Sequence, residues 1–195
     1  SILKAVFPLS GIDAVVGSPW TYSGPALQSG GDGWDTLLTA LETKRVAEGS
    51  TRYYYGALNV AYSSGVAGLG YVPTAGSSNG RSAIGWDKTG FGDGGDYNDV
   101  YAHETGHNLG RSHSPCGNVG SSDPSYPYAG GFIGAVGLDV NTGSLKSPSV
   151  YKDLMGYCSP NWVSDHVYKG VLTHREITLQ PIAHEWTNGK TTDRA

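Results

Sequence analysis

Residues 103–113 read HETGHNLGRSH, and they combine three histidines, one glutamate and two glycines in a fixed spacing. Side chains four positions apart lie on one face of a helix, one turn apart, so His103 and His107 can reach the same metal ion. Glu104 lies one step round the helix, where it can stand beside the ion without binding it. A helix with this order of residues predicts a metal site with a general base.

The third histidine lies beyond the end of that helix. Gly110 tolerates a left-handed backbone, so the chain can turn sharply there and bring His113 back toward the same ion. Three protein ligands leave one tetrahedral position for water, which is typical of a catalytic zinc site. The alternatives are histidines that only pack or face solvent, and a zinc ion that only holds the fold. A structural zinc site has no use for Glu104, so we predict one catalytic Zn²⁺ bound by His103, His107 and His113.

The pattern resembles the long zinc signature H-E-x-x-H-x-x-G-x-x-H of the metzincin metalloproteases. Its central HE-x-GHNLG is similar to the reprolysin-like and adamalysin-like branch, and to secreted bacterial metzincins that attack mucin-type glycoproteins. The resemblance implies an α/β (α+β) fold with a twisted, mixed, mainly parallel sheet and the active-site helix at the floor of a cleft. It also implies a single catalytic domain, with an N-terminal lobe over about residues 1–112 and an irregular C-terminal lobe over about 113–195.

Metzincins also carry a methionine in a tight turn beneath the metal, and the one methionine of this chain is Met155, in DLMGY. The resemblance implies that Met155 packs under the metal-binding imidazoles without binding the ion. Tyr157 lies where astacins and serralysins have a tyrosine that binds the zinc or stabilises the transition state; the alternative is a tyrosine that fills space under the turn. Ser114 stands where astacins have a glutamate that pairs with the mature N-terminus, so the resemblance does not extend to that activation mechanism.

Hydrophobic patterning outlines the remaining elements. Three segments keep a helical period: 34–49, 96–109 and 160–174. Five apolar, β-branched or aromatic runs predict strands: 2–8, 13–16, 52–62, 66–72 and 81–86. Asp96 or Asn98 can cap the second helix, and 52–62 is expected at the centre of the sheet. By the resemblance, 66–72 is the candidate edge strand that pairs with an extended substrate.

Composition limits the function further. The 195 residues suit one domain, and the net charge of −4 without a basic block argues against a nucleic-acid partner. No run approaches the roughly 18 consecutive apolar residues of a membrane span. Cys116 and Cys158 fit one disulfide in an exported protein, with two buried free thiols as the alternative. If the metzincin fold is right, this bridge ties the loop after the third ligand to the methionine turn.

Other acidic and histidine side chains carry weaker signals. The loop at 90–99 places three aspartates, Asp93, Asp96 and Asp99, among glycines, which is compatible with a Ca²⁺ site or with a flexible loop followed by a helix cap. The histidines outside the signature are expected to be packed or at the surface: His166, His174 and His184. Two acidic residues are expected to be solvated or to pair along a helix: Asp165 and Glu176.

Together these features predict a secreted zinc endopeptidase that acts as a monomer on protein or glycoprotein substrates. Glu104 takes a proton from the attacking water, and Tyr157 helps to hold the oxyanion. A thermolysin-type hydrolase takes its third ligand from a later glutamate, and Gly110 and His113 argue against it. The alternative from another class is a protein- or glycan-binding module on a degenerate protease fold, whose surface the 13 tyrosines and 5 tryptophans would line.

Overall fold

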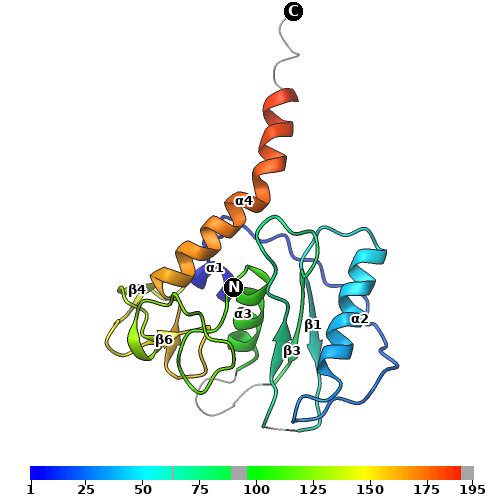
Figure 1. The fold of residues 1–195 in the computed structure, drawn as a ribbon, viewed down its shortest axis with the longest axis horizontal. Helices are drawn as coiled ribbons and strands as arrows, with labels where there is room; N and C mark the ends of the chain where they lie inside the picture. The colour runs from blue at the N-terminus through cyan, green and yellow to red at the C-terminus, as the bar shows by residue number, and fades with distance from the viewer. Residues whose placement is uncertain (63, 89–95, 190–195) are drawn as a thin grey trace, which may run out of the picture.

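The computed structural model describes residues 1–62, 64–88 and 96–189, and it confirms an α+β fold (Figure 1). Up to the metal-binding helix, the elements are α1 (Ile2–Val6), α2 (Trp34–Ala47), β1 (Tyr54–Leu58), β2 (Gly68–Gly70), β3 (Ser82–Trp86) and α3 (Tyr97–Asn108). After it come a 3₁₀ turn, η1 (Ala129–Gly131), four short strands, β4 (Gly137–Asp139), β5 (Ser144–Lys146), β6 (Lys152–Asp153) and β7 (Asn161–Trp162), and the long helix α4 (Asp165–Gly189).

The first half of the chain forms three layers, with the sheet between α2 and α3 (Figure 1). The strand order is β1-β3-β2, with β1 parallel and β2 antiparallel to β3. The sheet is therefore mixed, as predicted, but it has one parallel pairing and one antiparallel pairing rather than being mainly parallel. Every residue of β3 is buried, because helices cover both of its faces and strands flank both of its edges.

The prediction that 52–62 forms the central strand is wrong. Only Tyr54–Leu58 is a strand, β1, and it lies at an edge, while β3 takes the centre. The side chains of β3 are all buried between the two helices, whereas those of β1 are partly buried or exposed, as expected of a strand with a neighbour on one edge only. The predicted helices 34–49 and 96–109 are confirmed as α2 and α3.

The two strands predicted nearest the N-terminus are also wrong. Residues 2–6 form the short helix α1, which buries Leu3 and Val6, three positions apart and therefore on one helical face. A short apolar run does not distinguish a strand from a buried helical turn, because too few residues define a period. The second run, 13–16, forms no element, and its Val15 and Val16 are exposed.

The last helix begins later than the predicted 160–174. Asn161 and Trp162 belong instead to β7, which pairs in parallel with β6, and α4 begins at Asp165. Ser164 sets this boundary, because its hydroxyl accepts a 3.0 Å hydrogen bond from the backbone N–H of Val167 and so caps the first turn. No helix in the described part of the chain combines the length and the hydropathy that crossing a membrane requires.

Helix α3 separates two hydrophobic cores. One core joins α2 to the sheet, with Trp34, Leu38 and Ile84 among its buried members. The other joins α1, α3 and the C-terminal segments around Met155 and Val171, which are both fully buried. Packing on two sides fixes the position of α3, so the side chains that it presents between the cores are held rigidly.

A buried ion pair connects α2 to the sheet. Arg45, only 2% exposed, donates hydrogen bonds of 2.9 and 2.7 Å to the carboxylate of Glu42. The same carboxylate accepts 2.7 Å bonds from the backbone of Gly80 and the hydroxyl of Ser82. Burial alone would raise the pKa of Glu42, but these hydrogen bonds and the charge of Arg45 outweigh it and lower the pKa to about 2.

We expect Glu42→Gln to lower the free energy of unfolding by about 2 kcal/mol at pH 7, since charge-assisted hydrogen bonds to a buried arginine are lost. The folded pKa lies below the unfolded value near 4.5, so this stabilisation is complete above about pH 4.5 and is lost as the pH falls toward 2. Urea unfolding at several pH values measures the effect. Glu176 is an exposed glutamate on α4, so Glu176→Gln is the matched control. An equal loss of unfolding free energy in both variants at pH 7 would contradict the prediction.

Candidate metal centre

The end of α3 redirects the chain toward the helix that it has just left. Gly110 has a φ of 77°, a left-handed conformation that only glycine adopts without strain. Its N–H donates to the carbonyl of His107, and the N–H of Arg111 donates to the carbonyl of Gly106, at 2.8 and 3.0 Å. This pair of bonds is the Schellman ending of a helix. It turns the chain so that His113, beyond the helix, faces the two histidines on it.

Hydrogen bonds fix the tautomer of each ring. In all three histidines Nδ1 lies within hydrogen-bond distance of a backbone carbonyl, which can only accept. Nδ1 therefore carries the proton, and Nε2 keeps a free lone pair, the form that binds a metal. The pairs are His103 with Leu154 at 2.8 Å, His107 with Arg111 at 2.7 Å and His113 with Gly120 at 2.6 Å.

The three rings converge on one point. Their ligand nitrogens all lie within 4.8 Å of one another, and Nε2 of His107 is 3.2 Å from Nε2 of His113. Two nitrogens bound tetrahedrally to one zinc at about 2.0–2.1 Å are separated by roughly 3.3 Å, so the spacing fits this ion. Burial, reinforced by the neighbouring histidines, lowers the pKa of His103 to about 3 and that of His107 to about 4. Both rings therefore stay neutral, as metal binding requires.

Glu104 lies beside the histidines and faces β2. Its carboxylate is buried, and Oε2 has no hydrogen-bond partner among the described residues. Burial raises the pKa of Glu104 to about 8. A buried carboxylate without a partner is costly, so it marks a position where a water or a cation belongs.

The strand opposite Glu104, β2, has glycines at the two positions that face the carboxylate. A Cβ on Gly68 would lie 2.5 Å from Oε1 of Glu104, and a Cβ on Gly70 would lie 3.2 Å from Oε2. Alternate strand residues face the same side, so the Gly-Leu-Gly sequence of β2 turns two glycines toward the carboxylate and packs Leu69, which is partly buried, against the core. The edge strand can therefore approach the candidate base closely.

Tyr157 reaches the third histidine. Its hydroxyl lies 3.2 Å from Nε2 of His113 and donates to it, because that nitrogen holds the lone pair. The side chain is 58% exposed, so the hydroxyl lies on the open side of the triad. Partial burial of the ring and the nearby charge of Glu104 raise the pKa of Tyr157, which keeps the phenol protonated.

The turn that contains Met155 packs against α3. Met155 is fully buried, and a Cβ on Gly106, the residue before His107, would lie 2.4 Å from its sulfur. Asp153, also fully buried, accepts 2.7 Å hydrogen bonds from the backbone N–H groups of Met155 and Ser164. One buried carboxylate thus joins the turn to the start of α4.

The predicted disulfide between Cys116 and Cys158 is confirmed, with a Cα–Cα distance of 5.7 Å. It joins the loop after His113 to the residue after Tyr157. Two backbone hydrogen bonds run alongside it, from Ser114 to Met155 at 3.1 Å and from Tyr157 to Cys116 at 2.9 Å. The bridge therefore supports the two segments that place His113 and Tyr157.

We expect reduction of this disulfide to lower the free energy of unfolding by about 2–4 kcal/mol, because the bridge closes a loop of 42 residues in the unfolded chain. Urea unfolding with and without a reductant measures the difference. The double variant Cys116→Ala, Cys158→Ala is the control, since reductant should leave its midpoint unchanged. An unfolding midpoint of the wild-type chain that does not respond to reductant would contradict the prediction.

The weaker sequence signals lie only partly within the described residues. The Ca²⁺ prediction rests largely on 90–95, which lies outside the described residues; Asp96 stands at the start of α3 without a side-chain cap bond. Among the described residues, only the three histidines of the triad lie close enough together to hold one metal ion.

Among the described residues, the remaining histidine and acidic side chains with sequence signals are not part of the triad. His174 is buried on α4, and His166 pairs with Asp123 at 2.9 Å. Asp165 pairs with Lys169 at 2.6 Å, and Glu176 is exposed. His184 lies in the part of α4 whose side chains are not described.

Sequence reasoning missed several residues that hold the site together. Asn108, 2% exposed, donates 2.9 Å hydrogen bonds to the carbonyls of Tyr71 and Ser82, and so ties the end of α3 to the sheet. The glycines of β2 and the carboxylate of Asp153 were missed as well. Glycines at alternate positions in a strand were a usable signal, because a strand interior contains glycine mainly where another part of the chain approaches closely.

Residues 32–114 match the family model described as metallo-peptidase family M12B, reprolysin-like. The matched segment includes α2, the sheet, α3 and all three histidines. The predicted metzincin resemblance is thereby confirmed for this segment. No curated protein matches the chain. The family match and the histidine triad together support a metal-dependent peptidase.

Proposed function

We propose that this chain, reprolysin-like over residues 32–114, is a secreted zinc-dependent endopeptidase of the metzincin group. The observation that carries the proposal is the convergence of three unprotonated Nε2 atoms beside a buried carboxylate that lacks a partner. A site that only binds zinc for stability has no use for Glu104 at that place. The disulfide fits an oxidising, extracellular environment.

In this proposal His103, His107 and His113 would hold one Zn²⁺, which would supply Lewis acidity toward a carbonyl oxygen and lower the pKa of a bound water. Glu104 takes a proton from the attacking water and returns it to the leaving amine. Tyr157 donates its phenolic hydrogen to the oxygen on which negative charge develops. Its position on the open side of His113 supports this role, because a substrate approaches from there.

The edge strand β2 supplies a binding surface for an extended peptide. It pairs with β3 on one side, and no strand of the described chain pairs with its other side. A substrate that pairs with this free edge as an added strand runs past Glu104, because the glycines of β2 face that carboxylate. We propose protein or glycoprotein substrates, one catalytic domain with lobes on either side of about residue 112, and a monomer in solution.

A chelator assay tests the function. We expect the purified chain to hold about one zinc and to cleave casein or a mucin-type glycoprotein; 1,10-phenanthroline should abolish cleavage, and added Zn²⁺ but not Ca²⁺ should restore it. Activity that survives complete removal of zinc would contradict the proposal. Binding of the glycoprotein by the zinc-loaded chain without any cleavage would favour the alternative binding module.

A further inference from the structure

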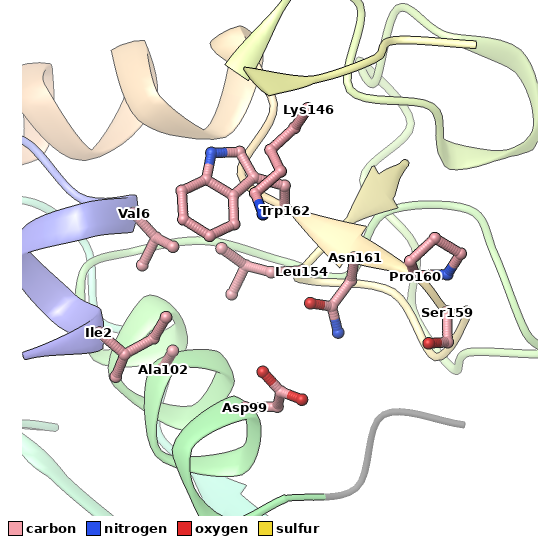
Figure 2. Close-up of a pocket in the computed structure, with 10 residues that line it drawn as sticks. All are labelled: Ile2, Val6, Asp99, Ala102, Lys146, Leu154, Ser159, Pro160, Asn161 and Trp162. Carbon is pink, nitrogen blue, oxygen red and sulfur yellow. The ribbon is translucent and has the colours of Figure 1, made fainter. Parts of the chain in front are cut away.

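A cavity of about 280 Å³ lies beside the N-terminal half of α3 (Figure 2). Ile2 and Val6 of α1 and Leu154 of the methionine turn give it an apolar wall. The carboxylate of Asp99 and the amide of Asn161 point into the same space from different elements. The cavity is therefore apolar along one side and acidic at one end.

This cavity lies next to the metal centre. Asp99 is four residues before His103, so the two side chains leave α3 on the same face, one helical turn apart. Leu154 lies between the two sites, because its carbonyl accepts the hydrogen bond from Nδ1 of His103 while its side chain lines the cavity. A side chain next to a peptide bond held at the triad is long enough to span one helical turn.

Asp99 lacks a cationic partner within the described chain. No described residue forms an ion pair or a side-chain hydrogen bond with its carboxylate, which is half-buried. Burial and the neighbouring Asp96 raise the pKa of Asp99, as expected of an acid whose charge is not compensated. Lys146 also lines the cavity, but its amine lies 5.0 Å from the ring centre of Trp162 and 5.3 Å from that of Tyr151, at the far end in Figure 2.

We propose that the cavity holds the side chain of the substrate residue next to the cleaved bond, and that Asp99 selects a long cationic side chain, lysine or arginine. The apolar wall contacts the methylene groups, and Asp99 accepts charge-assisted hydrogen bonds from the ammonium or guanidinium. Asn161 offers a second acceptor through its amide oxygen. Asp99 is thus a specificity-determining residue, and the inference rests on the proposed endopeptidase function.

The test uses a fluorogenic peptide series in which the residues flanking the cleaved bond are varied in turn among lysine, arginine, norleucine, glutamine and glutamate. At one of the two positions the zinc-loaded wild-type chain should prefer lysine over norleucine by about ten- to a hundredfold in kcat/KM. Asp99→Asn should bring that ratio close to one, and Asp99→Lys should make the glutamate peptide the better substrate. Zinc content and circular dichroism confirm that each variant is loaded and folded.

Asp35→Asn is the matched control, because Asp35 occupies the first turn of α2 as Asp99 occupies the first turn of α3. It should keep the wild-type ratio. Cleavage by the wild-type chain with no preference for a cation at either position overturns the subsite and leaves the endopeptidase standing, as does an unchanged lysine preference in Asp99→Asn. A zinc-loaded wild-type chain that cleaves no peptide of any kind overturns both.

Discussion

Glu104→Ala should lower kcat/KM for peptide hydrolysis by about 10²- to 10⁴-fold while the chain keeps its zinc. In the proposed mechanism the three histidines hold the ion, and their rings are hydrogen-bonded to backbone carbonyls that the substitution does not touch. In the same mechanism Glu104 takes the proton from the attacking water, and its buried carboxylate faces the glycines of β2. Zinc content measured beside the rate separates the loss of the base from the loss of the metal.

Two further measurements sharpen this result. Glu104→Gln keeps the volume of the side chain but cannot accept the proton, so it should be as inactive as the alanine variant. Both variants remove a buried carboxylate that lacks a partner, so neither should lower the thermal stability of the zinc-loaded chain. A Glu104→Ala chain with near wild-type activity would refute the role of Glu104, and Glu176→Gln controls for a change of net charge alone.

The metal centre was predictable from sequence because its geometry is largely local. His103 and His107 are placed by the period of one helix, and Gly110 allows the sharp turn that returns His113. Only a resemblance to a known family could place Met155 and Tyr157, which lie more than 40 residues farther along. The cysteine pair was predictable as a disulfide because no other cysteine is present.

The errors arose where partners distant in sequence decide the structure. The run at 2–6 is helical because Leu3 and Val6 pack into the core beside α3, which lies about a hundred residues farther along the sequence. The tyrosine-rich β1 reads as a central strand from its own residues, yet β3 occupies that place because two helices cover it. The pocket around Asp99 was equally hidden, since it is assembled from α1, α3, the methionine turn and β7.

His113→Ala should lose zinc and activity together. Its removal leaves two ligands, both on one helix, and takes away the acceptor that Tyr157 contacts at 3.2 Å. Loss of an outer-shell partner of a ligand already costs about 10- to 100-fold in metal affinity, so loss of the ligand itself should cost more than about a hundredfold. Equilibrium dialysis against a zinc buffer measures the affinity, and peptide cleavage measures the activity.

The comparison with a second histidine makes this result specific. His166 lies on α4 and pairs with Asp123, whose backbone N–H bonds to the carbonyl of His113, so His166 is near the same loop without entering the triad. His166→Gln should keep its zinc, whereas His113→Ala should lose it. Full zinc stoichiometry in His113→Ala would mean that the ion is held elsewhere. In that case Glu104 would have no polarised water beside it. The loss of zinc in His113→Ala therefore tests the whole proposed site, whereas Glu104→Ala tests the base alone.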